Sequence, residues 1–526
     1  MFIVGFSAAG IQSHIMESGQ LRDIAAGSEV IEGLCNRDLD KCLEVVGARD
    51  TDVRIRAAGK VRVGFADKAV ARRFIRLWSL VVRERAPGLR HAIALVDGDD
   101  ADSTIRLEET LETTIRLPVL EPLPAMPLTM RSARTGKAAV REDSLGDDPL
   151  EAIDLSTSRR RDYFGEGGRR LLEARFGLPD RWRFTSDAAV LGGEGVAVAM
   201  VHADGTGFGQ MFAEVGQALA GDPAAADILR ALSQAVGEAT SAAAAEACGA
   251  AFEDHGAGPA GPRVVLPMRP IVLGGDDLTV LLEARRALTF SARFLEAFER
   301  IGANRLDDLR RDFPRRSLPL PTHLTAAVGI AFTHAAFPAV LAHRLAEDIC
   351  AWVKTHLRPI GRSGLAFHRV TASNVDHWDT VLDQELTGPG GARLTMAPYV
   401  TARDKGDGEE RGEREHGGGS FPTIGALDEL CRTARALPRG AWREILDLCR
   451  VAPLQADHRF QRMVEIGLRS DEATRLATIA MGAALRELAP DADQAAFWCD
   501  GAGGKVTPWA DVAALLGLER RIEEDE

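Results

Sequence analysis

The chain has 526 residues, of which 45% are hydrophobic and 27% charged, and its formal net charge is −13. That length predicts several domains, and the negative charge argues against a protein that coats nucleic acid through a basic surface. The seven cysteines form no Cys-x-x-Cys pair, so neither a disulfide framework nor a zinc finger is expected. There is no signal peptide and no apolar run long enough to span a membrane, which predicts a cytoplasmic protein.

Residues 1–100 are expected to form a first unit with the order β-α-β-β-α-β. Hydrophobic spacing predicts its strands and helices at 2–7, 11–37, 53–65, 67–85 and 91–96. The unit ends in Asp97-Gly98-Asp99-Asp100, which follows the last strand instead of joining the two middle strands. We interpret this acidic stretch as a solvated turn, so the first unit is expected to be non-catalytic.

Residues 101–190 are expected to link this unit to a second one. The region contains no cysteine, so a structural zinc site is not expected there. Its basic stretch at 158–161, with Arg169 and Arg170, is interpreted as a solvated face, or else as a contact for RNA or a partner.

A strand-like apolar run at 196–203 ends in Asp204, and Gly205, Gly207 and Phe208 follow before a helical stretch at 210–219. A carboxylate at a strand end, followed by glycines and a helix N-terminus, suits a metal ion and a phosphate. Backbone N–H groups and the helix dipole favour an anion at that position.

Two further carboxylates stand in Gly274-Gly275-Asp276-Asp277, between apolar runs at 265–273 and 278–282. This pattern predicts a β-hairpin with both acids at its tip. Crowding two anions costs free energy unless a cation offsets them, and paired oxygen ligands suit Mg²⁺ or Mn²⁺. An ordinary Gly-Asp hairpin turn is the alternative.

A helix at 285–301 and a strand at 324–332 complete a second β-α-β-β-α-β order, which is the ferredoxin-like arrangement. Its first strand can lie beside the hairpin, so Asp204 is expected to meet Asp276 and Asp277 around a metal pair. This second unit is expected over 191–404, with an Ala-rich helical insertion at 222–252.

The remaining chain is expected to be a flexible linker at 405–420, rich in charge and glycine, and a helical domain at 421–526. The predicted fold class is therefore α+β: two ferredoxin-like, palm or cyclase type domains, a linking region and a C-terminal α-helical domain.

The Gly-Gly-Asp-Asp hairpin with Asp204 at its spacing resembles the palm domain of the CRISPR polymerase family. These are the large subunits of type III CRISPR effector complexes, which make cyclic oligoadenylates. Residues 10–15 and 21–28 are similar to the family's first palm signature, and residues 324–331 and 345–354 fit its second palm. The resemblance spans roughly residues 1–400.

The resemblance implies nucleotidyl transfer on ATP in antiviral defence, with Mg²⁺ or Mn²⁺ held by the catalytic residues Asp204, Asp276 and Asp277. The residues expected at the nucleotide are Gly205, Gly207, Phe208, Gly274, Gly275, Lys354, Gln12 and Ser28. Lys354 is open to a second interpretation as a surface lysine, and Gln12 and Ser28 as residues that cap and pack a helix.

The resemblance also implies partners, which are subunits of an RNA-guided complex or a second copy of the chain. No His-Asp doublet precedes the first unit, so the family's nuclease domain and DNA cleavage are not expected. Two other functions stay open. One is a diguanylate-cyclase-type enzyme, although that class usually carries Gly-Gly-Asp/Glu-Glu-Phe where this chain has Leu278 and Thr279. The other is a non-catalytic scaffold.

Overall fold

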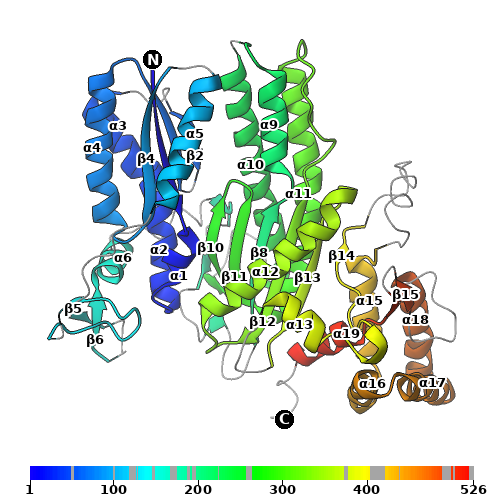
Figure 1. Ribbon diagram of the computed structural model, residues 1–526. Coiled ribbons are helices and arrows are strands. Elements are labelled where there is room, and N and C mark those ends of the chain that lie inside the picture. The colour runs from blue at the N-terminus through cyan, green and yellow to red at the C-terminus, as the bar shows by residue number, and fades with distance from the viewer. Residues whose placement is uncertain are drawn as a thin grey trace.

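The computed structural model shows a mixed α+β protein built around two larger sheets (Figure 1). It describes residues 1–48, 53–57, 59–98, 101–117, 126, 128–144, 149–165, 175–179, 181–185, 190–191, 197–222, 224–255, 263–371, 377–402, 421–437, 439–488, 499–501 and 504–519. The linker expected at 405–420 lies outside these residues, as do Asp99, Asp100, Arg169 and Arg170.

The first unit forms a four-stranded sheet in the order β2-β3-β1-β4, and every pair of neighbours in it is antiparallel. The chain order of its elements is β1 (Phe2–Ala9), α1 (Ile11–Met16), α2 (Leu21–Gly33), a π-helical turn (Leu34–Asp38), α3 (Leu39–Val46), β2 (Val53–Ala57), β3 (Lys60–Phe65), α4 (Lys68–Arg85) and β4 (Arg90–Asp97). Phe6, Phe74 and Trp78 pack edge-on and stacked between the sheet and α4.

The single helix expected at 11–37 is wrong, because the chain breaks between α1 and α2. Gly19 sits at the break with a φ of 72°, in the left-handed region that side chains disfavour. The short helix α1 is therefore separate from α2, and it also contacts the second unit.

The linking region contains α5 (Ala101–Arg116), which packs on β1 and β4, and a β5–β6 hairpin that leads into α6. These elements are β5 (Ala139–Asp143), β6 (Glu151–Asp154) and α6 (Leu155–Gly165), and β7 (Trp182–Phe184) follows them. The interpretation of residues 158–161 as a solvated face is wrong. Ser158 and Arg160 are buried. The Arg161 side chain is 5% exposed and forms an ion pair of 3.0 Å with the buried Asp23 on α2.

The second unit forms a six-stranded sheet in the order β10-β11-β8-β12-β13-β14, in which only β12 and β13 run parallel. Its strands are β8 (Ala197–Gly205), β9 (Val264–Leu266, paired with β7), β10 (Met268–Gly274), β11 (Asp277–Glu283), β12 (Ala326–His334), β13 (Gly364–Arg369) and β14 (Tyr399–Val400). Its helices are α9 (Phe208–Ala218), α10 (Ala225–Ala251), α11 (Ala284–Asp312), α12 (Ala339–Leu357) and α13 (Trp378–Gln384), with short 3₁₀ turns at Glu253–His255, Arg358–Ile360 and Pro389–Gly391.

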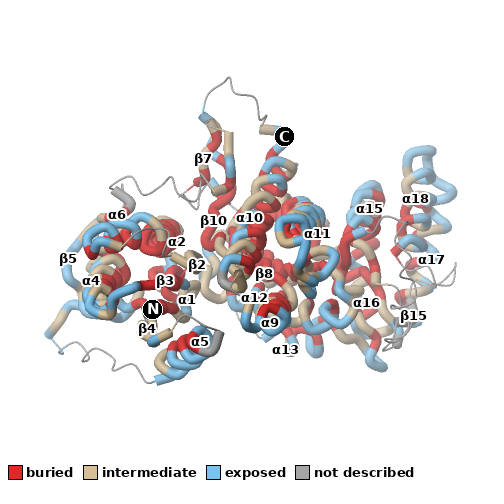
Figure 2. Tube along the Cα trace, turned by 90° about the horizontal axis from the view of Figure 1, so that it is seen from above, coloured by how far each residue is buried: buried red, intermediate tan, exposed pale blue. Residues whose placement is uncertain are grey.

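The apolar run of β8 is explained by its place at the centre of this sheet, between β11 and β12. Residues 198–203 are all buried, whether their side chains point to one face or the other. Burial on both faces selects a continuous apolar strand instead of an alternating one. Asp204 stands where that strand leaves the core. Seen from above, buried residues run through β8 and β10, while exposed residues gather on the outer turns of α4 and α5 (Figure 2).

The C-terminal part is mainly helical and also contains a two-stranded hairpin of β15 and β16. Its elements are α15 (Ile424–Ala434), α16 (Arg439–Val451), α17 (Pro453–Arg469), α18 (Glu472–Leu488), β15 (Cys499–Gly501), β16 (Gly504–Val506), α19 (Trp509–Leu516) and a 3₁₀ turn (Gly517–Glu519). Among the helices that the structure describes, none is long and apolar enough to cross a membrane.

Asp511 on α19 forms hydrogen bonds between this helical part and the second unit. One oxygen of its buried carboxylate accepts hydrogen bonds from the Tyr399 hydroxyl at 2.5 Å and from the Thr395 hydroxyl and the Met396 amide at 3.0 Å. Burial nevertheless raises the pKa of Asp511 to about 6. Since the folded pKa lies above the unfolded one, the folded chain binds more protons between these values, and stability falls as pH rises through that window.

We therefore expect Asp511→Asn to remove part of the pH dependence of stability. From the shift of this one group, wild type loses roughly 3 kcal/mol between pH 4 and pH 7. The variant is neutral throughout and does not undergo this loss. Melting temperatures of both proteins at pH 5 and pH 7.5 check this, and a difference between them that does not change with pH would contradict it.

Candidate functional site

The strand register of the second sheet brings the three predicted acids together. Asp277, the first residue of β11, stands directly opposite Asp204 near the end of β8. Residues opposite one another in an antiparallel pair point to the same face, so the two carboxylates share one side of the sheet. Gly274 pairs with Asp277, and Gly275 and Asp276 form the two-residue turn between them. The Gly205 amide donates to the Asp276 carbonyl at 3.1 Å, which holds the turn against β8.

Gly205 is required by the closeness of this contact. A Cβ built on it would come within 2.8 Å of the Asp276 Cβ and within 1.8 Å of the Phe208 ring. Gly207 forms the N-cap of α9, and Phe208 begins the helix with its ring turned into the core against Phe298. The first N–H groups of any helix lack partners within it, so the start of α9 offers donors beside Asp204.

Helix α12 covers the face of the sheet that carries Asp204. Gly329 on β12 lies opposite His202, and a Cβ there would overlap the main chain of α12 at Ala346. This close packing places Lys354 of α12 over the carboxylates, where its ammonium group forms an ion pair with Asp204 Oδ2. Lys354 is therefore paired with one of the three predicted acids, and its side chain is partly exposed.

The first unit also reaches the acids. Gln12 on α1 donates a hydrogen bond of 2.7 Å from its amide nitrogen to Asp277 Oδ2, across a sequence separation of 265 residues. Lys60, at the hairpin turn of the first sheet, lies close enough to Asp276 to lower the pKa of that carboxyl group. Two donors from the first unit thus face the acidic turn of the second.

Ser28 takes part in the same interface at a different point. Its side chain is buried, and its hydroxyl donates to the Ile271 carbonyl in the middle of β10. The structure thus uses Ser28 to join α2 to the edge of the second sheet, away from the hairpin tip.

The surroundings of the two hairpin carboxyl groups disfavour their ionised forms. Burial, followed by the charge of Asp204, raises the pKa of Asp276, while Lys354 and Lys60 oppose the rise. Burial and the charges of Asp204 and Asp276 raise the pKa of Asp277 well above its usual value. Asp277 Oδ1 is buried and accepts no hydrogen bond from the residues that the structure describes, although His202 Nδ1 lies 3.6 Å away. Such an arrangement favours a cation at these oxygens.

A divalent metal fits this donor set, but the protein does not supply a complete cage for it. In the described part of the chain, no group of three or more His, Cys, Asp or Glu side chains is arranged to hold a metal by itself. One oxygen of Asp204 is paired with Lys354, and one oxygen of Asp277 with Gln12. Mg²⁺ commonly uses one or two carboxylates, waters and substrate phosphates, so the residues fit a metal that arrives with a nucleotide.

Four nearby residues were not predicted as site residues. Lys60 is one of them, and Glu347 lies on α12 close enough to raise the pKa of Asp277. Arg358 follows one turn after Lys354 and donates to Gln210 at the start of α9 at 2.9 Å. His202 is a buried residue that hydrogen-bonds Thr279 Oγ1 at 3.0 Å. The helical spacing of Glu347, Lys354 and Arg358 is the signal that could have indicated the residues on α12.

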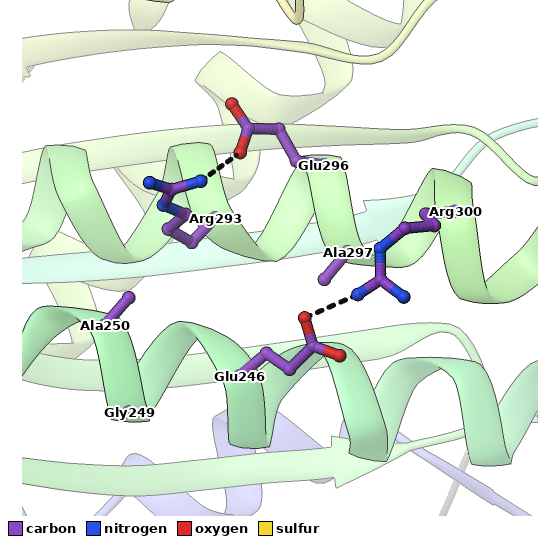
Figure 3. Close-up of a pocket in the computed structure, with 7 residues that line it drawn as sticks. All are labelled: Glu246, Gly249, Ala250, Arg293, Glu296, Ala297 and Arg300. Atoms are coloured by element: carbon purple, nitrogen blue, oxygen red, sulfur yellow. Dashed lines mark hydrogen bonds and ion pairs between the residues drawn. The ribbon is translucent and has the colours of Figure 1, made fainter.

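A separate groove lies between α10 and α11, and none of the predicted site residues lines it (Figure 3). Both of its arginines are paired with glutamates, Arg293 with Glu296 at 3.0 Å and Arg300 with Glu246 at 2.5 Å. The groove offers no unpaired charge for a phosphate, so we place the candidate site at the acidic hairpin.

No protein-family model and no curated protein matches the chain. Several solved structures do. They are structures of Csm1, alone or with Csm4. Csm1 in T. onnurineus matches with a TM-score of 0.49 and 13% identity, over 98% of this chain and 69% of that chain. The Csm1–Csm4 cassette in complex with cA4 matches with a TM-score of 0.47 and 12% identity, over 93% and 70% of the two chains. The Csm1–Csm4 cassette in complex with one ATP matches with a TM-score of 0.43 and 12% identity, over 93% of this chain and 70% of that chain. These values describe a distant likeness of shape and assign no activity to this chain.

Proposed function

We propose that this chain is a metal-dependent nucleotidyltransferase that converts ATP into cyclic oligoadenylates, and that it belongs to the CRISPR polymerase family. One observation supports this above all. Asp204, Asp276 and Asp277 converge at the end of the β8–β11 pair, between a lysine and a helix N-terminus. One buried oxygen of Asp277 accepts no hydrogen bond within the described part of the chain. Carboxylates beside donors for phosphate are the parts that nucleotidyl transfer needs.

We also propose that the two larger units are both ferredoxin-like palm domains, the first non-catalytic and the second catalytic. Each has the β-α-β-β-α-β order, and the strand orders β2-β3-β1-β4 and β10-β11-β8-β12 are equivalent. The equivalent hairpins differ in charge, since the first carries Lys60 where the second carries Asp276 and Asp277. A catalytic palm facing a cationic one suits a site that must hold two polyanionic substrates.

In the proposed reaction, a ribose hydroxyl oxygen of one ATP bonds to the α-phosphorus of another, and the bond from that phosphorus to the α,β-bridging oxygen breaks. Pyrophosphate leaves with the bridging oxygen, and the hydroxyl proton passes to water. Asp204, Asp276 and Asp277 would hold the metal ions. When bound, Mg²⁺ or Mn²⁺ lowers the pKa of the attacking hydroxyl and offsets charge on the phosphates. Lys354 and the N-terminus of α9 bind and orient the triphosphate, and Gln12 orients Asp277.

Nucleotide choice tests this function against a diguanylate-cyclase-type enzyme, which also uses an acidic hairpin. We expect incubation with Mn²⁺ and ATP to give adenylate products, and GTP to be a poor substrate. Chromatography of the products against cyclic oligoadenylate and cyclic di-GMP standards decides between the two. Cyclic di-GMP as the sole product would overturn the ATP assignment, and unchanged ATP and GTP would favour a scaffold.

A further inference from the structure

Arg160 is a buried arginine with no carboxylate in hydrogen-bond contact among the partners that the structure gives it. Its side chain is 2% exposed, on α6 in the linking region. Its Nη1 donates to the Ile15 carbonyl at 3.0 Å, and its Nη2 donates to the His14 carbonyl. Burying a charge costs free energy unless hydrogen bonds and opposite charge offset it. The burial of this charged side chain therefore indicates a structural role for Arg160.

The carbonyls that Arg160 binds belong to the buried C-terminal end of α1. The last four carbonyls of a helix have no partner within it, and a cation there also complements the helix dipole. Lys137, from the loop before β5, adds an ion pair with Glu17 at the same end. The linking region therefore holds α1 by its C-terminal end with two cations.

The packing around Arg160 is specific. Gly27 of α2 lies against it, and a Cβ there would come within 3.4 Å of both Arg160 Nε and the Ile15 Cα. Gly27 thus lies directly beside both the arginine and α1. Asp154 caps the start of α6 by accepting from the Ser156 and Thr157 amides at 2.8 and 3.1 Å, which fixes the helix that presents Arg160.

Helix α1 is also the element that carries Gln12 to Asp277. It is only six residues long and is separated from α2 by the break at Gly19. So short a helix has little stability of its own, and its position depends on its tertiary contacts. Arg160 contacts the C-terminal end of α1. Gln12 lies near the other end, so its position at Asp277 depends on the orientation of the helix.

We propose that Arg160 is a positioning residue of the acidic site. By capping α1, Arg160 holds Gln12 in hydrogen-bonding position to Asp277. The linking region thereby helps to orient one of the proposed metal-binding carboxylates. The effect of Arg160 on catalysis rests on the proposed function, whereas its contacts with α1 do not. Partners of a metal-binding side chain commonly alter metal affinity by about 10- to 100-fold.

A double-mutant cycle on Mn²⁺ binding, measured by calorimetry without nucleotide, tests this role. We expect Gln12→Ala to weaken Mn²⁺ binding about 10-fold and Arg160→Met to weaken it several-fold. Because Arg160 acts through Gln12, Arg160→Met should cause no further loss in the Gln12→Ala background. Arg160→Lys keeps donors for the carbonyls and should restore part of the affinity, and it also serves if the methionine variant folds poorly.

Arg62→Met is the matched control. Arg62 is also buried in the first unit and donates to two backbone carbonyls, Phe6 O and Val61 O. It pairs with Glu108 of α5, and none of these hydrogen-bond and ion-pair partners lies on α1. It should lower thermal stability without changing Mn²⁺ affinity. Hydrogen exchange should accelerate at residues 11–16 in Arg160→Met and not in Arg62→Met, a readout that needs neither metal nor nucleotide.

Equal weakening by Arg160→Met in wild-type and Gln12→Ala backgrounds would overturn the positioning role, as would unchanged exchange in α1. A wild-type chain that binds Mn²⁺ but consumes no nucleotide would contradict the proposed function. The double-mutant cycle on Mn²⁺ binding could still be measured in that case. The two failures are therefore distinguishable.

Discussion

Changing Asp276 and Asp277 together to Asn is expected to abolish pyrophosphate release while the protein stays folded. The two carboxylates are the proposed metal ligands at the hairpin turn, and Asn keeps their shape without their charge. Loss of even one group that stabilises transition-state charge slows enzymes by about 100- to 1,000-fold, so the double variant should lose on the order of 1,000-fold or more. A coupled pyrophosphate assay with Mg²⁺ and ATP measures this.

The same variant should be at least as stable as wild type, and this separates chemistry from folding. Burial and neighbouring negative charge raise the pKa of both carboxyl groups. The folded chain therefore binds protons more tightly than the unfolded chain, and wild-type stability falls as pH rises through the raised pKa values. Without metal, the melting temperature of the variant should depend less on pH. Full turnover by the variant, or its unfolding, would contradict this account of the hairpin.

The second large effect is expected from Lys354→Met. This change removes the partner of Asp204 and the cation that we place on the triphosphate. Methionine keeps much of the length and packing of the lysine stem. We expect kcat/KM for ATP to fall about 100-fold, through a higher KM as well as a lower kcat, because a phosphate-binding charge acts in the ground state and the transition state.

Lys354→Arg and Lys68→Met provide the controls for that result. Arginine keeps the charge and should retain part of the activity, although its fork differs in shape from an ammonium group. Lys68 pairs with Asp97 at 3.0 Å on the exposed face of the first unit, so its replacement should leave turnover unchanged. A Lys354→Met variant with wild-type KM and kcat would remove Lys354 from the site.

The local parts of this structure could be predicted from the sequence. The two apolar runs around Gly274-Gly275-Asp276-Asp277 form a hairpin, and the apolar run before Asp204 forms the central strand β8, because burial on both faces selects such a run. The β-α-β-β-α-β order is sufficient to expect that Asp204 lies beside the hairpin, and the register places it opposite Asp277. The helix expected at 11–37 is interrupted at residues 17–20, where Gly19 has a positive φ.

The contacts between units could not be predicted in the same way. Gln12 and Asp277 are 265 residues apart, and no local pattern reports how two domains dock. Arg160 and Arg161 were interpreted as solvated because charge runs usually are, but their partners lie on α1 and α2, far away in sequence. Lys60 occupies a turn that carries no other sign of function.

The most direct test of the central claim is ATP binding by calorimetry, with and without Mn²⁺, to wild type and to the Asp276→Asn/Asp277→Asn variant. If the hairpin carboxylates hold a metal that arrives with a nucleoside triphosphate, wild type should bind ATP tightly only when Mn²⁺ is present, and the variant should lose that dependence. Equal ATP affinity with and without Mn²⁺, or equal affinity in both proteins, would contradict it.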